Sequence, residues 1–173
     1  MPLHPHLQAA LDAIDSTTAG MSEAELAEHR RPGKWSAAEI LEHLSLGYSG
    51  TTYGMSKVLE KGRPLGRRPG LKACVGILMA VGVGYFPKIE APESTRPRGL
   101  RPLEALNAVR VQLLLMEEAL NRVEARFGPR VLVANHPLLE GFSVARWRRF
   151  HWQHTRHHTK QIRAMRAMVV DGQ

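Results

Sequence analysis

The sequence predicts an all-α protein, an antiparallel four-helix bundle in one domain over residues 1–173. Three observations favour this fold. Leu, Ala, Arg, Glu and Met are plentiful while β-branched and aromatic residues are sparse, a composition that favours helices over strands. Apolar residues recur at spacings of three and four in four long segments. A chain of 173 residues, 43% of them hydrophobic, is long enough to bury one substantial core.

The first helix is predicted over residues 3–17, where four apolar residues share a face: Leu3, Leu7, Leu11 and Ile14. The second begins in the segment KWSAAEILEHL. Ser36 is a favourable N-cap, and Glu39, three residues later, completes a capping box. We therefore expect this helix to run from residue 36 to about residue 60.

A long crossover is predicted between the second and third long helices. It opens with the basic loop KGRPLGRRPG and continues into the apolar insert 71–86, where we expect a short extra helix. The proline-rich segment PKIEAPESTRPRGLRP follows and predicts an extended connection, because proline disfavours helical backbone in the residue before it.

The third long helix is predicted over residues 103–127, which carry apolar residues at core spacing: Leu106, Val109, Leu113, Met116, Leu120 and Val123. We expect residues 128–142 to form a loop with at most one short extended stretch. Ser143 is a favourable N-cap for the fourth helix, which should run to about residue 169. Short connections elsewhere favour antiparallel packing of the four helices.

Composition excludes several classes of protein. The lone Cys74 excludes a disulfide framework and a multi-cysteine zinc site, and its apolar neighbours predict a small buried residue. The most apolar segment spans about 14 residues, fewer than the roughly 20 of a membrane-spanning helix, so we expect no transmembrane segment. The N-terminus lacks the pattern of a signal peptide, which predicts a cytoplasmic protein.

The charge of the chain points to no specific nucleic-acid partner. A net charge of +8 attracts anions, and a basic binder of anions or nucleic acid is one alternative function. However, the arginines are scattered through loops without interleaved aromatic residues, so we attribute the charge mainly to solubility. Apolar outer stripes on the helices leave a homodimer open.

Four of the nine histidines fall in the segment FHWQHTRHHTKQI. With about 100° per residue in a helix, His158 lies about 40° to one side of His154 and His151 about 60° to that side. Gln161 lies about 20° and His157 about 60° to the other side. The apolar stripe that begins at Trp147 passes through the same positions. His154 and His158 therefore belong to the buried face, with His157 at its edge.

A further histidine, His43, lies on the inward stripe of the well-capped second helix. The stripe continues through Gly47, Gly50 and Gly54 and is almost free of side chains beyond the imidazole. Glycine in a helix costs about 1 kcal/mol relative to alanine, so a gain should offset it. Either the glycines permit close helix packing, or they leave room beside the histidine. We prefer the second interpretation.

Inward imidazoles need polar partners, because an unpaired buried polar group costs about 1–3 kcal/mol. They can form hydrogen bonds with neighbouring helices, as in a non-catalytic bundle that acts by association. Alternatively they can bind a metal: histidines at i and i+4 converge above a helix, and His43 adds a third ligand to His154 and His158. Three imidazoles with an open fourth position are typical of a catalytic metal site.

The segments KWSAAEILEHL and HWQHTRHHTKQI resemble the DinB-like (DinB/YfiT) superfamily of four-helix bundles. Its members have a Trp-Ser entry to the second helix with a downstream histidine, and an H-x-x-H-H-x-x-Q-I pattern in the last helix. The segment NHPLLEGF resembles the His-Pro loop of one branch. The resemblance extends over about residues 5–168.

This resemblance implies a divalent metal, zinc or nickel, on His43, His154 and His158, with Gln161 and His157 as neighbours rather than ligands. It implies a small-molecule substrate and either thiol S-transfer, with a low-molecular-weight thiol, or hydrolysis by a metal-activated water. His151 departs from the family pattern, and we expect a proton carrier, an extra ligand or a packed residue. The insert 71–86 exceeds the minimal bundle and is in a position to roof the site.

Overall fold

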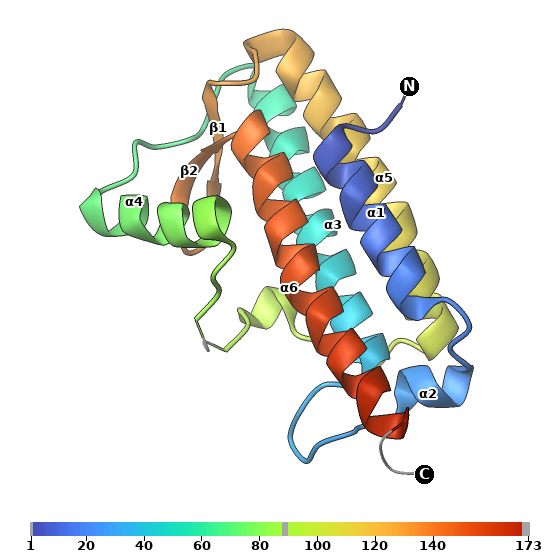
Figure 1. The fold of residues 1–173 in the computed structure, drawn as a ribbon. Helices are drawn as coiled ribbons and strands as arrows, with labels where there is room; N and C mark the ends of the chain where they lie inside the picture. Colours follow the sequence, from blue (N-terminus) through green and yellow to red (C-terminus); the bar gives the residue numbers. More distant parts are fainter. Residues whose placement is uncertain (1, 88–89, 171–173) are drawn as a thin grey trace.

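The computed structural model describes residues 2–87 and 90–170, and four long helices form most of it (Figure 1). They lie side by side, with α3 packed against α5 and α1 against α6. The all-α fold and the helical bundle predicted from the sequence are therefore confirmed. The four helices are α1 (Pro5–Thr18), α3 (Ala37–Lys61), α5 (Pro102–Phe127) and α6 (Val144–Val170).

The crossover between α3 and α5 sets the direction of the helices. It contains α4 (Leu71–Ile77), the π-helical turn η1 (Leu78–Val83) and the 3₁₀ turn η2 (Glu93–Thr95). It carries the chain back along the bundle, so that α5 runs in the same direction as α3, while α1 and α6 run opposite to both (Figure 1). The bundle thus consists of two parallel pairs, α3 with α5 and α1 with α6, and the two pairs run antiparallel to each other.

The start of α3 has the predicted capping box. The Ser36 hydroxyl accepts a hydrogen bond from the Glu39 amide at 3.2 Å, and the Glu39 carboxylate accepts one from the Ser36 amide at 2.7 Å. Both bonds satisfy amide groups that a helix terminus leaves without intrahelical partners. At the other end Gly62 adopts a left-handed conformation with φ of 66°, which glycine accommodates without strain.

The structure contains elements that the sequence did not predict. A short helix, α2 (Glu23–Ala27), has its own capping box between Ser22 and Glu25. Strands β1 (Leu132–His136) and β2 (Glu140–Ser143) form an antiparallel hairpin where we expected a loop with one extended stretch. The chain after α3 packs tightly on this hairpin: a Cβ added at Gly141 would lie 1.9 Å from the Arg67 carbonyl oxygen.

The prediction of a buried Cys74 is wrong. The residue is exposed on the outer side of α4, which projects from the bundle beside the hairpin and contributes only Ile77 to the core (Figure 1). The surrounding apolar run was therefore a poor guide to burial. Among the described residues, no helix is both long enough and apolar enough to cross a membrane.

A buried carboxylate holds the end of the crossover against α3. Glu42 is almost inaccessible to solvent. Its two oxygens accept three hydrogen bonds of 2.8–3.1 Å from consecutive backbone amides, those of Arg98, Gly99 and Leu100. Because a buried carboxylate is stable only when its oxygens have donors, this contact fixes the last residues of the crossover.

A second buried charge joins α5 to α6. Arg148 and Glu117, whose side chains are 4% and 5% exposed, form an ion pair of 3.0 Å. The other two guanidinium nitrogens donate to Glu124 and Asn121, both at 2.6 Å. The second oxygen of Glu117 accepts from the His4 amide at 3.2 Å, which ties the start of α1 to the same network. The charged groups of Arg148, Glu117 and Glu124 therefore all have polar partners.

We predict that Arg148→Ala lowers the free energy of unfolding by about 3–5 kcal/mol, because it leaves the Glu117 carboxylate buried without its counter-ion. Urea unfolding followed by circular dichroism measures this change. Arg156→Ala on the exposed face of the same helix is the control and should change stability by less than about 0.5 kcal/mol. Equal effects of the two substitutions would contradict the assignment.

Candidate metal centre

Three imidazoles from distant parts of the chain meet between α3 and α6. The Nε2 atom of His154 lies 3.3 Å from Nε2 of His43 and 3.1 Å from Nε2 of His158. One ligand nitrogen from each ring lies within 4.8 Å of the other two. Two nitrogens bound to one tetrahedral zinc at about 2.0–2.1 Å would be about 3.3 Å apart, so this group of three could hold a metal ion.

The outer nitrogens of two of these rings have acceptors that set their tautomers. Nδ1 of His43 lies 2.8 Å from the Thr95 carbonyl oxygen, to which only a protonated Nδ1 can donate. Nδ1 of His158 lies 2.9 Å from the Gln161 side-chain oxygen. Both neutral rings therefore carry the proton on Nδ1 and direct an Nε2 lone pair toward the centre. Such hydrogen bonds orient the histidine ligands of metal sites.

All three imidazoles are neutral at pH 7. Burial and the neighbouring His43 lower the pKa of His158 to about 3. Burial, followed by the proximity of His158 and His43, holds the pKa of His154 well below its usual value. Burial also lowers the pKa of His43, and the bond to Thr95 opposes this shift. Neutral rings keep their lone pairs, which a metal requires.

Hydrogen bonds alone satisfy this cluster poorly. The lone pairs of His43 and His158 both point at His154, whose neutral ring has one N–H group to offer. One proton can form one good bond or two weak, shared ones. Otherwise two lone pairs face each other at about 3 Å. A cation at the centre would be attracted by all three lone pairs at once, and the donor set therefore fits a metal better than a closed network.

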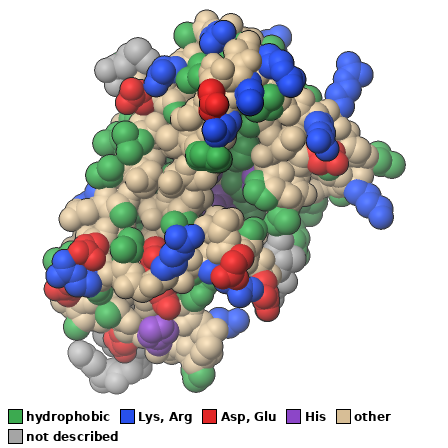
Figure 2. Space-filling view, turned by 180° about the vertical axis from the view of Figure 1, so that it is seen from behind, with side chains coloured by type: hydrophobic (Ala, Val, Ile, Leu, Met, Phe, Trp, Pro, Cys, Tyr) green, Lys and Arg blue, Asp and Glu red, His purple; other side chains and the backbone are tan. Residues whose placement is uncertain are grey.

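The cluster opens into a groove with a volume of about 1550 Å³. Histidine side chains are visible at the floor of the hollow in the middle of Figure 2. The groove is also lined by Gly47, Gly50 and Gly54 of α3, and a Cβ added at any of them would meet nothing within 4 Å. The glycine stripe thus leaves room beside His43, as we preferred, and does not serve close helix packing.

Aromatic rings form the walls next to the imidazoles. The Trp35 ring lies 5.0 Å from that of His43, and Phe150 stacks on His154 with the centroids 5.5 Å apart. Phe86, at the end of the insert, contacts His154 and His157 with centroid distances of 5.3 and 5.2 Å. The insert therefore covers part of the site, as predicted. These rings restrict both the orientation of the imidazoles and the access of water.

The two further histidines predicted near the site lie outside the group of three. His157 accepts a hydrogen bond from the Gln161 amide at 3.2 Å, and so belongs to the chain of contacts that ends at His158. His151 is buried, stacks on Trp147 and lies 2.9 Å from the Thr51 hydroxyl through Nε2. Burial lowers its pKa to about 3. These contacts favour the packed role of His151 over that of a proton carrier.

Three residues of the site were not predicted from the sequence. Thr95 acts through its backbone carbonyl, which no side-chain pattern can reveal. Phe86 comes from the insert, whose path is set by tertiary packing. His136 lines the groove, and its ring lies 4.5 Å from that of Phe150; burial lowers its pKa to about 4. The His-Pro pair at 136–137 was a usable signal, but it was not interpreted as part of the site.

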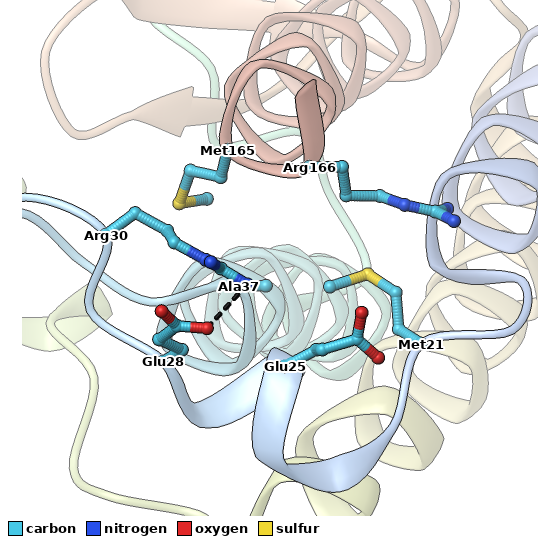
Figure 3. Close-up of a pocket in the computed structure, with 7 residues that line it drawn as sticks. All are labelled: Met21, Glu25, Glu28, Arg30, Ala37, Met165 and Arg166. Atoms are coloured by element: carbon cyan, nitrogen blue, oxygen red, sulfur yellow. Dashed lines mark ion pairs between the residues drawn. The ribbon is translucent and has the colours of Figure 1, made fainter. Parts of the chain in front are cut away.

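A second, smaller cavity of about 140 Å³ lies where α2 meets the end of α6 (Figure 3). Its walls mix methionines with charged residues, and Arg30 forms an ion pair with Glu28 at 2.5 Å on one side of it. Arg30 and Met165 line both cavities, so the small one adjoins the rim of the groove. The group of three histidines lies in the groove, which is therefore the candidate functional site.

The fold and the site define a class: a helical bundle with a three-histidine group that could hold a metal at the base of an open groove. A model of the DinB superfamily matches residues 6–162. No curated protein and no solved structure matches the chain. The matched region contains all three histidines and nearly the whole bundle. The chain therefore belongs to the DinB superfamily.

We predict that Gly50→Ala raises the free energy of unfolding by about 0.5–1 kcal/mol, because alanine suits a helix interior better and the new methyl group meets open space. Gly141→Ala is the opposite control and should be destabilising, because its Cβ would overlap the Arg67 carbonyl. Thermal or urea unfolding measures both. Destabilisation by Gly50→Ala would restore the close-packing interpretation of the stripe.

We predict that the metal-free protein loses stability as the pH falls from about 6.5 toward 4. Unfolded histidines bind protons near pH 6.5, whereas burial lowers the pKa of His151 to about 3 and of His136 to about 4. In this range the unfolded chain binds more protons, so each such group contributes about 1.4 kcal/mol per pH unit. His151→Gln should flatten the slope of unfolding free energy against pH by that amount; an unchanged slope would contradict this.

Proposed function

We propose that this protein is a metal-dependent enzyme that holds one divalent ion, zinc or nickel, on His43, His154 and His158. The observation that carries the proposal is the arrangement of lone pairs. Two neutral rings, each held by a partner on its outer nitrogen, direct Nε2 at a third ring that has a single proton to share. A cation could accept all three lone pairs at once, whereas the single N–H group of His154 can satisfy only one of the two facing lone pairs well.

The residues around the three imidazoles would have distinct tasks. Thr95 and Gln161 hold the Nδ1 protons of His43 and His158, which fixes both ring orientations. Trp35 and Phe86 limit access of water from the sides. When bound, a divalent ion would supply Lewis-acid chemistry, which lowers the pKa of a coordinated water or thiol toward neutrality.

We further propose that the substrate is a small molecule that enters by the groove. Its volume of about 1550 Å³ exceeds the 300–1000 Å³ typical of small-molecule sites, so a substrate and a low-molecular-weight thiol could share it. Thiol S-transfer and hydrolysis both fit such a site. A cytoplasmic location and a homodimer belong to the same proposal and rest on the sequence.

Two other functions stay as outcomes of the tests. A bundle without chemistry would fold normally, take up no metal and act by association. A binder of nucleic acid would show binding that weakens steeply with salt, because it would displace counterions from phosphates.

We predict that the protein, purified without a histidine tag, retains about one equivalent of zinc or nickel per chain by elemental analysis. His43→Ala and His158→Ala should each lose the metal, since two remaining imidazoles bind it far more weakly. His157→Ala is the matched control on the same helix and should keep it, because His157 contacts Gln161 instead of the centre.

Gln161→Leu gives an intermediate result. It removes the acceptor of His158 Nδ1 without removing a ligand, and should weaken metal affinity by about 10–100-fold. Failure of the folded parent protein to take up metal, or equal uptake by His43→Ala, would overturn the proposal in favour of a non-catalytic bundle.

The choice between thiol transfer and hydrolysis has its own test. Cobalt can replace zinc as a spectroscopic probe. Addition of a low-molecular-weight thiol to the cobalt-loaded protein should produce a sulfur-to-cobalt absorption band if the thiol route is correct, and the band should be absent from His158→Ala. A spectrum unchanged by thiol would favour hydrolysis.

A further inference from the structure

The segment formed by α4 and η1, residues 71–83, projects from the side of the bundle (Figure 1). One face of it packs inward. Ile77, Ala80 and Val81 are buried, and Ile77 and Val81 join the hydrophobic core. A Cβ added at Gly76 would lie 2.8 Å from the Leu139 side chain of the hairpin turn, so the segment is closely attached to the hairpin. It is therefore a packed element with a defined inner face.

The outer face of this segment is apolar as well. Leu71 is 85% and Leu78 63% exposed, and with the exposed Val75 between them they form a row at helical spacing. A soluble helix normally carries polar residues on the side opposite its core face. An exposed apolar cluster of this kind marks a surface that contacts something other than water. The exposed residues of the row and its continuation are Leu71, Val75, Leu78 and Val83, whereas Met79 and Tyr85 are exposed but also line the groove.

Basic residues lie before this apolar face and at its start. Residues 61–87 contain no acidic residue and five basic ones, all of them exposed: Lys61, Arg63, Arg67, Arg68 and Lys72. None of the five forms an ion pair with another described residue. Arg149 of α6 extends the basic area, since its guanidinium donates to the Gly82 carbonyl at 3.3 Å. In Figure 2 basic and hydrophobic side chains project together at the right-hand edge.

One acidic residue lies at the inner edge of this area. The Glu140 carboxylate accepts a hydrogen bond from the Gly70 amide at 2.7 Å, at the start of α4. The Glu140 carboxylate is thus engaged by the backbone amide at the start of α4. Among the described residues, it forms no ion pair with the five exposed basic ones, which keep their net positive charge.

We propose that the outer face of residues 71–83 docks on an anionic lipid surface. The segment is too short to cross a bilayer, which takes about 20 residues, but an interfacial helix only needs to lie in the plane of the head groups. Its apolar side chains would enter the boundary between head groups and acyl chains. The neighbouring lysines and arginines would contact anionic head groups, each strengthening binding by about fivefold.

The charge argues against a second copy of this chain as the occupant. A symmetric dimer through this face would bring the same basic residues of both chains together, and like charges across an interface oppose association. An anionic bilayer matches both features of the face at once: it accepts apolar side chains, and it neutralises their basic neighbours. The lipid surface is therefore the favoured partner.

The chain provides a convenient probe for the test. Cys74 is the single cysteine and is exposed on α4, so an environment-sensitive fluorophore can be attached there alone. Vesicles of phosphatidylcholine, with or without phosphatidylglycerol, are titrated with the labelled full-length protein. We expect a blue shift and co-sedimentation with the anionic vesicles only. Binding should weaken when salt is raised from about 0.1 M to about 1 M, which shortens the screening length from about 10 Å to about 3 Å.

The variant Leu71→Glu/Leu78→Glu should lower the partition coefficient by about tenfold or more, since it removes two side chains that would be buried in lipid. Leu103→Glu/Leu114→Glu on α5 is the matched control. It changes two half-exposed leucines (48% and 49%) and the net charge equally, away from the segment. Only a modest loss of binding is expected from it.

Three results would overturn the proposal: equal binding to neutral vesicles, no vesicle binding, and equal effects of the two double variants. A dimer dissociated by Leu71→Glu/Leu78→Glu, without vesicle binding, would assign the face to a second copy instead. The test does not depend on the metal, because His43→Ala should bind anionic vesicles as the parent protein does.

Discussion

The site depends on the attachment of the crossover to α3 by two adjacent residues. Glu42 accepts three backbone amides from residues 98–100, and His43 donates to the carbonyl of Thr95. An apolar core offers no other donors to a buried carboxylate. The position of Glu42 therefore fixes the position of residues 98–100 at the end of the crossover. The same attachment brings Thr95 to the ring of His43. The hydrogen bond that orients the candidate ligand His43 is therefore part of the same attachment that holds the crossover against α3.

A second constraint is that the imidazoles of His43, His154 and His158 occupy positions between α3 and α6 where apolar side chains would normally pack. Burial keeps the imidazoles neutral, and their partners direct the lone pairs inward, so the cluster is arranged before any ligand arrives. The glycine stripe of α3 then leaves space in front of the rings, in place of the side chains that would fill a core. The bundle accepts a large groove because α5 and α1 supply its core on the other side of α3 and α6.

The crossover links this groove to the surface that we assign to lipid. Met79 and Tyr85 line the groove and are also exposed beside the apolar row, and Phe86 reaches His154. A segment that contacts a bilayer on its outer face would therefore form part of the groove wall on its inner side.

The sequence alone was sufficient for the elements that local chemistry decides. The capping box of Ser36 and Glu39 placed the start of α3, and helical periodicity put His43, His154 and His158 on inward faces. The sequence did not reveal the hairpin, because its strands are stabilised by hydrogen bonds to each other and to the loop after α3. It also did not reveal the exposure of Cys74. Only the tertiary structure brought Thr95 to His43 and Phe86 to His154, because contacts between residues 52 or 68 positions apart depend on how the crossover packs and not on local spacing.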